Sequence, residues 1–161
     1  RGVAPDTSKA IELHQQAASL GHSWSQHQLG FLAEDDKAAA RWFLKAAEQG
    51  DATAACALAF AFRDGEGVQQ SAERYRQWIS TAALAGDLDA QVALGIDYRD
   101  GLHDFPVDAV SAKFWLKLAV DQGDEEAHEQ LEVLELPQPK PRSTCSKMIA
   151  SWLRDLASWF D

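Results

Sequence analysis

The feature that most constrains the fold of this sequence is an internal repeat marked by four glycines, Gly21, Gly50, Gly86 and Gly123. A leucine lies eight residues after each of them: Leu29, Leu58, Leu94 and Leu131. A leucine or a tryptophan lies eight residues before each of them: Leu13, Trp42, Trp78 and Trp115. We count positions from each glycine, so that the later leucine is at position +8. Apolar residues in this register predict two helices per unit, with the glycine closing the second helix.

The length of the unit excludes most other folds. Successive glycines from Gly50 onward are 36 and 37 residues apart, whereas Gly21 and Gly50 are only 29 apart. We expect the missing residues of that unit to come from the loop between its helices. A period of this size without strand signals is typical of an α/α solenoid, in which each unit buries its apolar face by stacking on its neighbours.

The repeated residues resemble the Sel1-like repeat (SLR) family, a relative of the tetratricopeptide repeats (TPR). Three stretches carry the resemblance: Ala90, Leu94, Gly95, Tyr98 and Gly101; Gly65, Gly67 and Val68; and Trp42, Lys45, Ala46, Ala47 and Gly50. The resemblance covers about residues 2–135 and implies an all-α fold, a right-handed superhelix of helix-turn-helix units. It also implies a bacterial scaffold or adaptor that binds other proteins, for example in regulation, in secretion or as the immunity partner of a toxin.

The repeat register divides the chain into three parts. We expect residues 1–136 to form the solenoid, with a partial repeat at 1–21, repeats at 22–50, 51–86 and 87–123, and a terminal helix at 124–136. Residues 137–142 contain three prolines and predict an extended linker. Residues 1–21 lack a first helix, so we expect the chain to be a fragment of a longer precursor.

The last part, residues 143–161, is predicted to be an amphipathic helix. Its apolar residues share one side at helical spacing: Met148, Ile149, Trp152, Leu153, Leu156, Trp159 and Phe160. Such a helix covers the end or groove of its own solenoid, docks on another chain such as a second copy, or lies on a membrane. The membrane is the least favoured of the three, because Lys147 and Arg154 are its only cations.

The net charge of −10 argues against nucleic acid and against an anionic membrane surface, since both require clusters of Lys and Arg. No stretch approaches the roughly 18 apolar residues that a membrane span requires. The chain has only two cysteines, Cys56 and Cys145, which suits a reducing compartment or a periplasmic protein without disulfides. The compartment is therefore left open between bacterial cytoplasm and periplasm.

The sequence offers little for catalysis, and we expect no enzyme, no metal and no cofactor. Glu125 and His128 form one Glu-x-x-His pair, but a di-iron bundle needs a second such pair and two further glutamates. Cys56 would be a nucleophile only with a base such as His27 nearby, and a buried structural thiol is the simpler interpretation.

Binding is easier to predict. Positions +6, +10 and +13 lie opposite the core positions of each first helix, and in similar repeats this side lines a concave groove. These positions hold His27, Phe31, Cys56, Phe60, Arg63, Val92, Ile96 and Arg99, and Trp24 lies on the same side. Position +10 is apolar in every unit, which predicts either a docking surface or packing between adjacent first helices.

These observations predict a non-catalytic scaffold that binds a protein or peptide in its groove, with Arg63 and Arg99 either binding partner carboxylates or remaining surface charges. The alternative is a self-associating or autoregulatory module whose C-terminal helix occupies its own groove or that of a neighbour. A metal-binding protein or an enzyme is the least favoured interpretation.

Overall fold

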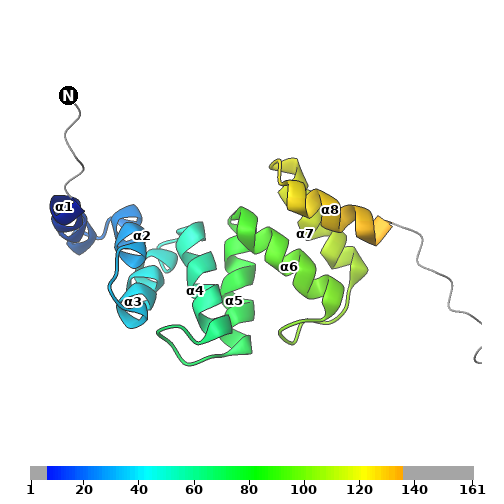
Figure 1. Cartoon of the computed structure of the whole chain (residues 1–161), viewed down its shortest axis with the longest axis horizontal. Helices are drawn as coiled ribbons and strands as arrows, with labels where there is room; N and C mark the ends of the chain where they lie inside the picture. The colour runs from blue at the N-terminus through cyan, green and yellow to red at the C-terminus, as the bar shows by residue number, and fades with distance from the viewer. Residues whose placement is uncertain (1–6, 136–161) are drawn as a thin grey trace, which may run out of the picture.

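The computed structural model describes residues 7–135, in which the chain forms eight helices and no strand. The helices are α1 (Thr7–Ser19), α2 (Ser23–Phe31), α3 (Asp36–Ala47), α4 (Ala52–Asp64), α5 (Ala72–Leu84), α6 (Leu88–Asp100), α7 (Ala109–Asp121) and α8 (Glu125–Glu135). They stand as antiparallel hairpins in an elongated array, with α1 at one end and α7 and α8 at the other (Figure 1). The predicted α/α solenoid is therefore confirmed. The predicted linker and C-terminal helix lie outside the described residues.

The closing glycines end the second helices by one shared device. Each has a positive φ, between 87° and 93°, which places it in the left-handed region that residues with a Cβ avoid. The amide of the next residue then donates to the carbonyl of the alanine at position −4, as from Asp51 to Ala46 at 3.1 Å and from Asp87 to Ala82 at 3.0 Å. This bond closes the helix and turns the chain back.

The residue after three of these glycines is an aspartate that caps the following helix. The carboxylates of Asp51, Asp87 and Asp124 accept hydrogen bonds from the amides of Ala54, Ala90 and Ala127, at 2.8, 3.0 and 2.6 Å. A cap of this kind stabilises a helix start by about 1 kcal/mol. The Gly-Asp pair thus explains why the junction between units recurs so regularly.

Within each unit, position +9 sets how closely the two helices approach. A Cβ on Gly30 would lie 2.4 Å from the Phe43 ring, and one on Gly95 would lie 2.7 Å from Leu116. Both glycines are therefore required by packing. The core residues on either side are fully buried, including Leu58, Ile79, Leu94 and Leu116.

Glutamines join neighbouring units at two equivalent junctions. Buried Gln26 donates to the carbonyl of Ala18 at 3.1 Å, and buried Gln91 donates to that of Ala83 at 3.3 Å. Each also accepts a hydrogen bond from the glutamine just before the next closing glycine, Gln49 at 2.6 Å and Gln122 at 2.8 Å. The middle unit has Ala55 at the same position, where it is part of the apolar core.

Two details of the predicted helices are wrong. In the third unit the repeat register predicts helices over about Leu88–Asp100 and Val107–Gln122. The first has these bounds as α6, whereas the second begins at Ala109 with Asp108 as its cap, so Pro106 precedes the helix instead of lying in its first turn. The cause is the side chain of Phe105, which is buried against Tyr98 with ring centroids 4.9 Å apart. This contact keeps the backbone after Phe105 in the loop, so the helix starts later than predicted. The short unit has also lost residues from its first helix, since α2 has 9 residues and α4 has 13.

Candidate functional site

The candidate binding surface lies on the first helices of the units, α2, α4, α6 and α8. Two pairs of these helices contact each other across units, α2 with α4 and α6 with α8. The stack places positions +6, +10 and +13 of successive units in parallel rows. The three rows differ in exposure, so they have different roles.

Position +6 faces the start of the next first helix. The Nδ1 atom of half-buried His27 lies 3.3 Å from the Oδ2 atom of Asp51, the cap of α4. Cys56 takes the equivalent place against Asp87 and is only 4% exposed. Cys56 therefore belongs to the junction between units, and its prediction as a groove residue open to a partner is wrong. Val92, at the same position in the third unit, packs partly buried against the core between α7 and α8.

Burial raises the pKa of the Cys56 thiol far above its usual range, and the carboxylates of Asp87 and Asp89 raise it further. A nucleophilic cysteine needs the opposite shift, towards the thiolate. The acidic neighbours and the burial together support the structural interpretation of this residue.

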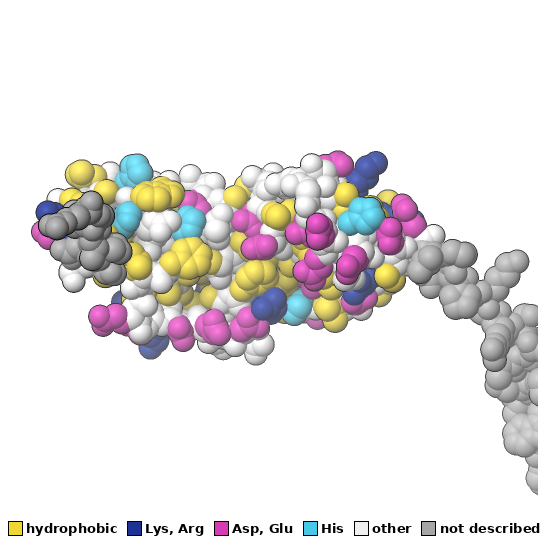
Figure 2. Space-filling model, turned by 45° about the horizontal axis from the view of Figure 1, so that its top comes forward, with side chains coloured by type: hydrophobic (Ala, Val, Ile, Leu, Met, Phe, Trp, Pro, Cys, Tyr) yellow, Lys and Arg dark blue, Asp and Glu magenta, His cyan; other side chains and the backbone are white. Residues whose placement is uncertain are grey.

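Position +10 forms an accessible apolar row along the array. Phe31 is 60% exposed and Val133 is 52% exposed, whereas Phe60 and Ile96 are half-buried. The Phe31 ring meets Phe43 edge-on with centroids 5.0 Å apart, which fixes its orientation while leaving most of it open. Figure 2 shows apolar side chains recurring from one end of the array to the other on the face it presents.

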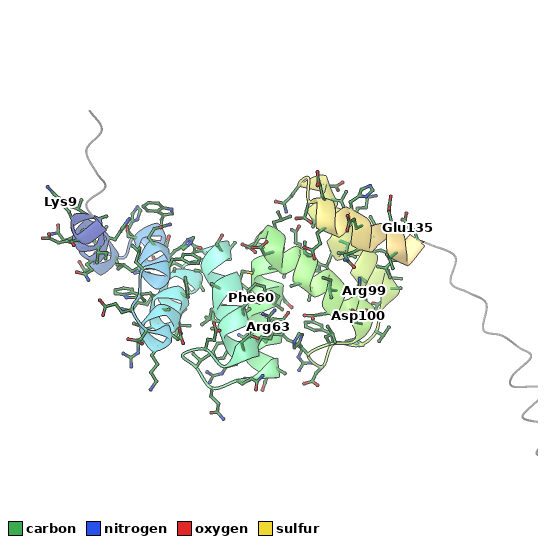
Figure 3. The ribbon with its side chains drawn as sticks, in the orientation of Figure 1. Lys9, Phe60, Arg63, Arg99, Asp100 and Glu135 are labelled. Atoms are coloured by element: carbon green, nitrogen blue, oxygen red, sulfur yellow. The ribbon has the colours of Figure 1, made fainter. Side chains whose placement is uncertain are left out.

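Position +13 carries arginines that are already paired. Arg63 donates from Nε and one Nη to the two carboxylate oxygens of Asp64, at 2.9 and 2.8 Å, and its guanidinium lies 4.5 Å from the centre of the Phe60 ring. Arg99 and Asp100 repeat the bidentate pair at 2.7 and 2.6 Å, and Arg99 also donates to Gln130. Figure 3 shows Phe60 and Arg63 together on α4, and Arg99 beside Asp100 towards the end of α6.

These pairs hold the pKa of the Asp64 and Asp100 carboxyls below their usual range. A carboxylate from a partner would have to compete with the neighbouring aspartate for the same guanidinium edge. Such competition favours the interpretation of Arg63 and Arg99 as locally compensated charges that flank the apolar row.

Trp24 extends the accessible aromatic surface at the N-terminal end. The residue is 54% exposed, and its ring lies 5.3 Å from that of His14 on α1. Trp24 and Phe31 lie on the same short helix, α2.

Within residues 7–135, no three histidine, cysteine or acidic side chains are placed to hold a metal ion. His128 pairs with Glu132 at the surface, 3.7 Å apart. In the same range, no helix is both long enough and apolar enough to cross a membrane.

Sequence reasoning missed one buried polar cluster. The Tyr75 hydroxyl donates to the Oδ2 atom of Asp97 at 2.5 Å, and the Nδ1 atom of His103 lies 2.8 Å from the Oδ1 atom. Asp97 is 2% exposed and stands at position +11, where the other units have Leu32, Ala61 and Leu134. That single acidic residue among apolar ones was the available signal.

A stack of α/α hairpins of this kind defines the class of helical-repeat proteins. The family model for the Sel1 repeat matches four segments of the chain, at residues 1–22, 24–51, 52–87 and 88–124. The chain therefore belongs to the Sel1 repeat family. Proteins of this family are generally non-catalytic scaffolds that bind other proteins.

Solved structures with the same fold include several bacterial proteins. A Sel1 repeat protein from Oxalobacter formigenes is 28% identical, with a TM-score of 0.77 over 87% of this chain and 42% of that one. The protein c5321, a protective antigen of uropathogenic Escherichia coli strains with an SLR fold, is 31% identical, with a TM-score of 0.75 over 83% of this chain and 30% of that one. The chain thus spans less than half the length of either protein.

Helicobacter pylori cysteine-rich protein B shares the fold at 21% identity, with a TM-score of 0.64 over 78% of this chain and 95% of that one. No curated protein matches the sequence.

Proposed function

We propose that this chain is a non-catalytic scaffold that binds a protein or peptide along the groove of its first helices. The observation that carries the proposal is the apolar row at position +10, formed by Phe31, Phe60, Ile96 and Val133. Its two ends are more than half exposed, although a surface that faces only water would be polar at these positions.

The row suits a partner that presents several apolar side chains along one line. Phe31 and Phe60 are the strongest anchors, because aromatic side chains combine a large contact area with few rotatable bonds. The paired arginines and aspartates beside them supply a polar rim with no large net charge. The net charge of −10 on the whole chain favours a basic partner during diffusional encounter.

As part of this proposal, the specific role is that of an adaptor in regulation or secretion, or that of the immunity partner of a toxin. Each of these roles needs the same accessible groove and no chemistry from the scaffold.

Affinity capture from an extract of the source cells tests the groove, with three forms of the immobilised chain. These are the wild type, Phe31→Asp/Phe60→Asp, and Leu20→Asp/Leu84→Asp as the matched control. Leu20 and Leu84 are 89% and 77% exposed and lie outside the first helices, so their substitution adds the same two charges at exposed apolar residues away from the groove.

We expect the groove variant to retain at least about tenfold less of a protein that the wild type and Leu20→Asp/Leu84→Asp both retain, as for a binding hot spot. Circular dichroism and thermal melting must show that both variants remain folded. Equal retention by all three forms would contradict the proposal.

A further inference from the structure

The outer face of α7 carries an apolar stripe that the equivalent helices lack. Val107, Val110 and Phe114 are 72%, 78% and 57% exposed, and half-buried Leu118 continues the same stripe. The corresponding residues are all polar on and before α5, namely Gln70, Glu73, Gln77 and Thr81. On and before α3 they are all charged, namely Glu34, Lys37, Arg41 and Lys45.

This difference is the reverse of what an exposed last unit needs. Terminal units of a solenoid usually turn a polar face to water, yet here the outer helix of the last complete hairpin is the one with the apolar face. The stripe therefore indicates a surface that is covered in the working protein.

The chain itself supplies a candidate cover at the right place. Helices α7 and α8 pack as an antiparallel hairpin around the turn at Gly123, so the end of α8 returns to the level where α7 begins (Figure 1). Glu135 marks this point, and residues 136–161 follow it in the sequence (Figure 3). Residues 137–142, if extended as their prolines predict, span about 3 Å each and about 18 Å together, which is enough to reach the neighbouring start of α7.

The lengths of the two apolar faces also agree. Val110 and Leu118 are eight residues apart on α7, and Trp152 and Phe160 are also eight residues apart in the sequence. In helical geometry this separation is about 12 Å. The predicted apolar face of residues 143–160 is rich in tryptophan, leucine and phenylalanine. Such a face buries its apolar area by packing against another apolar surface, and the stripe on α7 is one of matching length.

The alternative surface, on α8, is closed to such a helix. A second helix packs against a first helix through position +9, where Gly30 and Gly95 leave no room for a side chain. In α8 this position is Glu132, which is 69% exposed at its side chain, and Glu135 replaces the aromatic residue found at position +12 in α4 and α6. A helix laid there would bury the Glu135 carboxylate together with the surface pair of His128 and Glu132, which costs free energy because these groups lose water.

We propose that residues 143–160 fold back within the same chain and dock on the outer stripe of α7, formed by Val107, Val110, Phe114 and Leu118. This docking leaves the groove of the first helices open, so it goes beyond the proposed binding function and does not depend on it.

A spin label on the native thiol of Cys145 tests the docking in the full-length chain. The other cysteine, Cys56, is buried, so labelling is expected at one site per chain. The nitroxide broadens NMR signals of nearby amides, and we expect it to broaden those along α7 and to leave those of α2 and α4 unchanged. The reference is Val110→Glu/Phe114→Glu, in which the segment remains tethered to α8 but the stripe is charged.

The broadening along α7 should be lost in that reference and retained in the control Gln77→Glu/Leu84→Glu, which adds two glutamates at exposed sites of α5. Trp152→Glu/Trp159→Glu, which changes the segment and leaves the repeats untouched, should abolish it equally. Equal broadening in wild type and stripe variant would overturn the proposal, as would broadening along α2 and α4. Broadening that passes from a spin-labelled chain to a separate isotope-labelled chain in a mixed sample would place the segment on a second copy and also overturn it.

Discussion

At the scale of single residues, Cys56 shows how repeat stacking decides the character of a side chain. The same position holds His27 in the preceding unit and Val92 in the following one, and each meets the junction with the next unit. Burial and the carboxylates of Asp87 and Asp89 keep the Cys56 thiol protonated by raising its pKa. The Cys56 side chain therefore serves in packing, and its thiol is kept in the unreactive protonated form.

We predict that Cys56 does not react with a thiol reagent in the folded chain at pH 8. Cys145→Ser leaves Cys56 as the only cysteine, and the same protein unfolded in urea gives the reference rate. Because the folded pKa is raised, the contribution of this group to stability is complete below pH 8.5 and declines as pH rises above that value. Reaction of the folded chain at the rate of the unfolded one would show that the thiol is accessible.

At the scale of elements, the cluster around Asp97 joins α5, α6 and the loop between α6 and α7. The Tyr75 hydroxyl comes from α5, Asp97 from α6 and His103 from the loop. The rings of Tyr75 and His103 also meet edge-on, with centroids 4.6 Å apart. A second bond, from Arg76 to the carbonyl of Asp104 at 3.0 Å, fixes the same loop to α5.

We predict that Tyr75→Phe lowers the free energy of unfolding by about 1–3 kcal/mol, because Asp97 stays buried and loses one of its two hydrogen-bond partners. Urea unfolding followed by circular dichroism measures the change. Tyr98→Phe is the matched control, since it removes a hydroxyl from a ring that is only half-buried beside Phe105. Equal effects of the two substitutions would show that the Asp97 cluster contributes nothing specific.

The elements also show how far sequence reasoning reaches. The closing glycines and the aspartates after them are local signals, so the predicted bounds of α6, Leu88 and Asp100, are those of the structure. The start of α7 was misplaced because it depends on the burial of Phe105, a contact between loop and core that no local pattern reveals. Cys56 was assigned to the groove because a helical wheel of one unit cannot show which side chains the next unit covers.

At the scale of the whole molecule, the array is a row of units whose stability comes from their own packing and from contacts with their neighbours. The leucine at position +8 shows how completely each unit is packed, because it lies inside the unit. Leu58 and Leu94 are each 1% exposed in the interior of the array, whereas Leu131 is only half-buried in α8. Within the described residues, α8 has no second helix of its own beside it.

The same substitution should therefore have different effects along the array. We predict that Leu94→Ala lowers the free energy of unfolding by about 2–5 kcal/mol, because it leaves a cavity in a closed core. Leu131→Ala should cost less than half as much, since the side chain is already partly hydrated. Urea unfolding gives the magnitudes, and hydrogen exchange locates them. Leu94→Ala should raise exchange in α5, α6 and α7 together, because these helices share contacts, whereas Leu131→Ala should raise it mainly in α8 and in α7, its principal neighbour. Equal costs at the two positions would mean that α8 is packed as fully as the interior units, and that residues beyond Glu135 cover it.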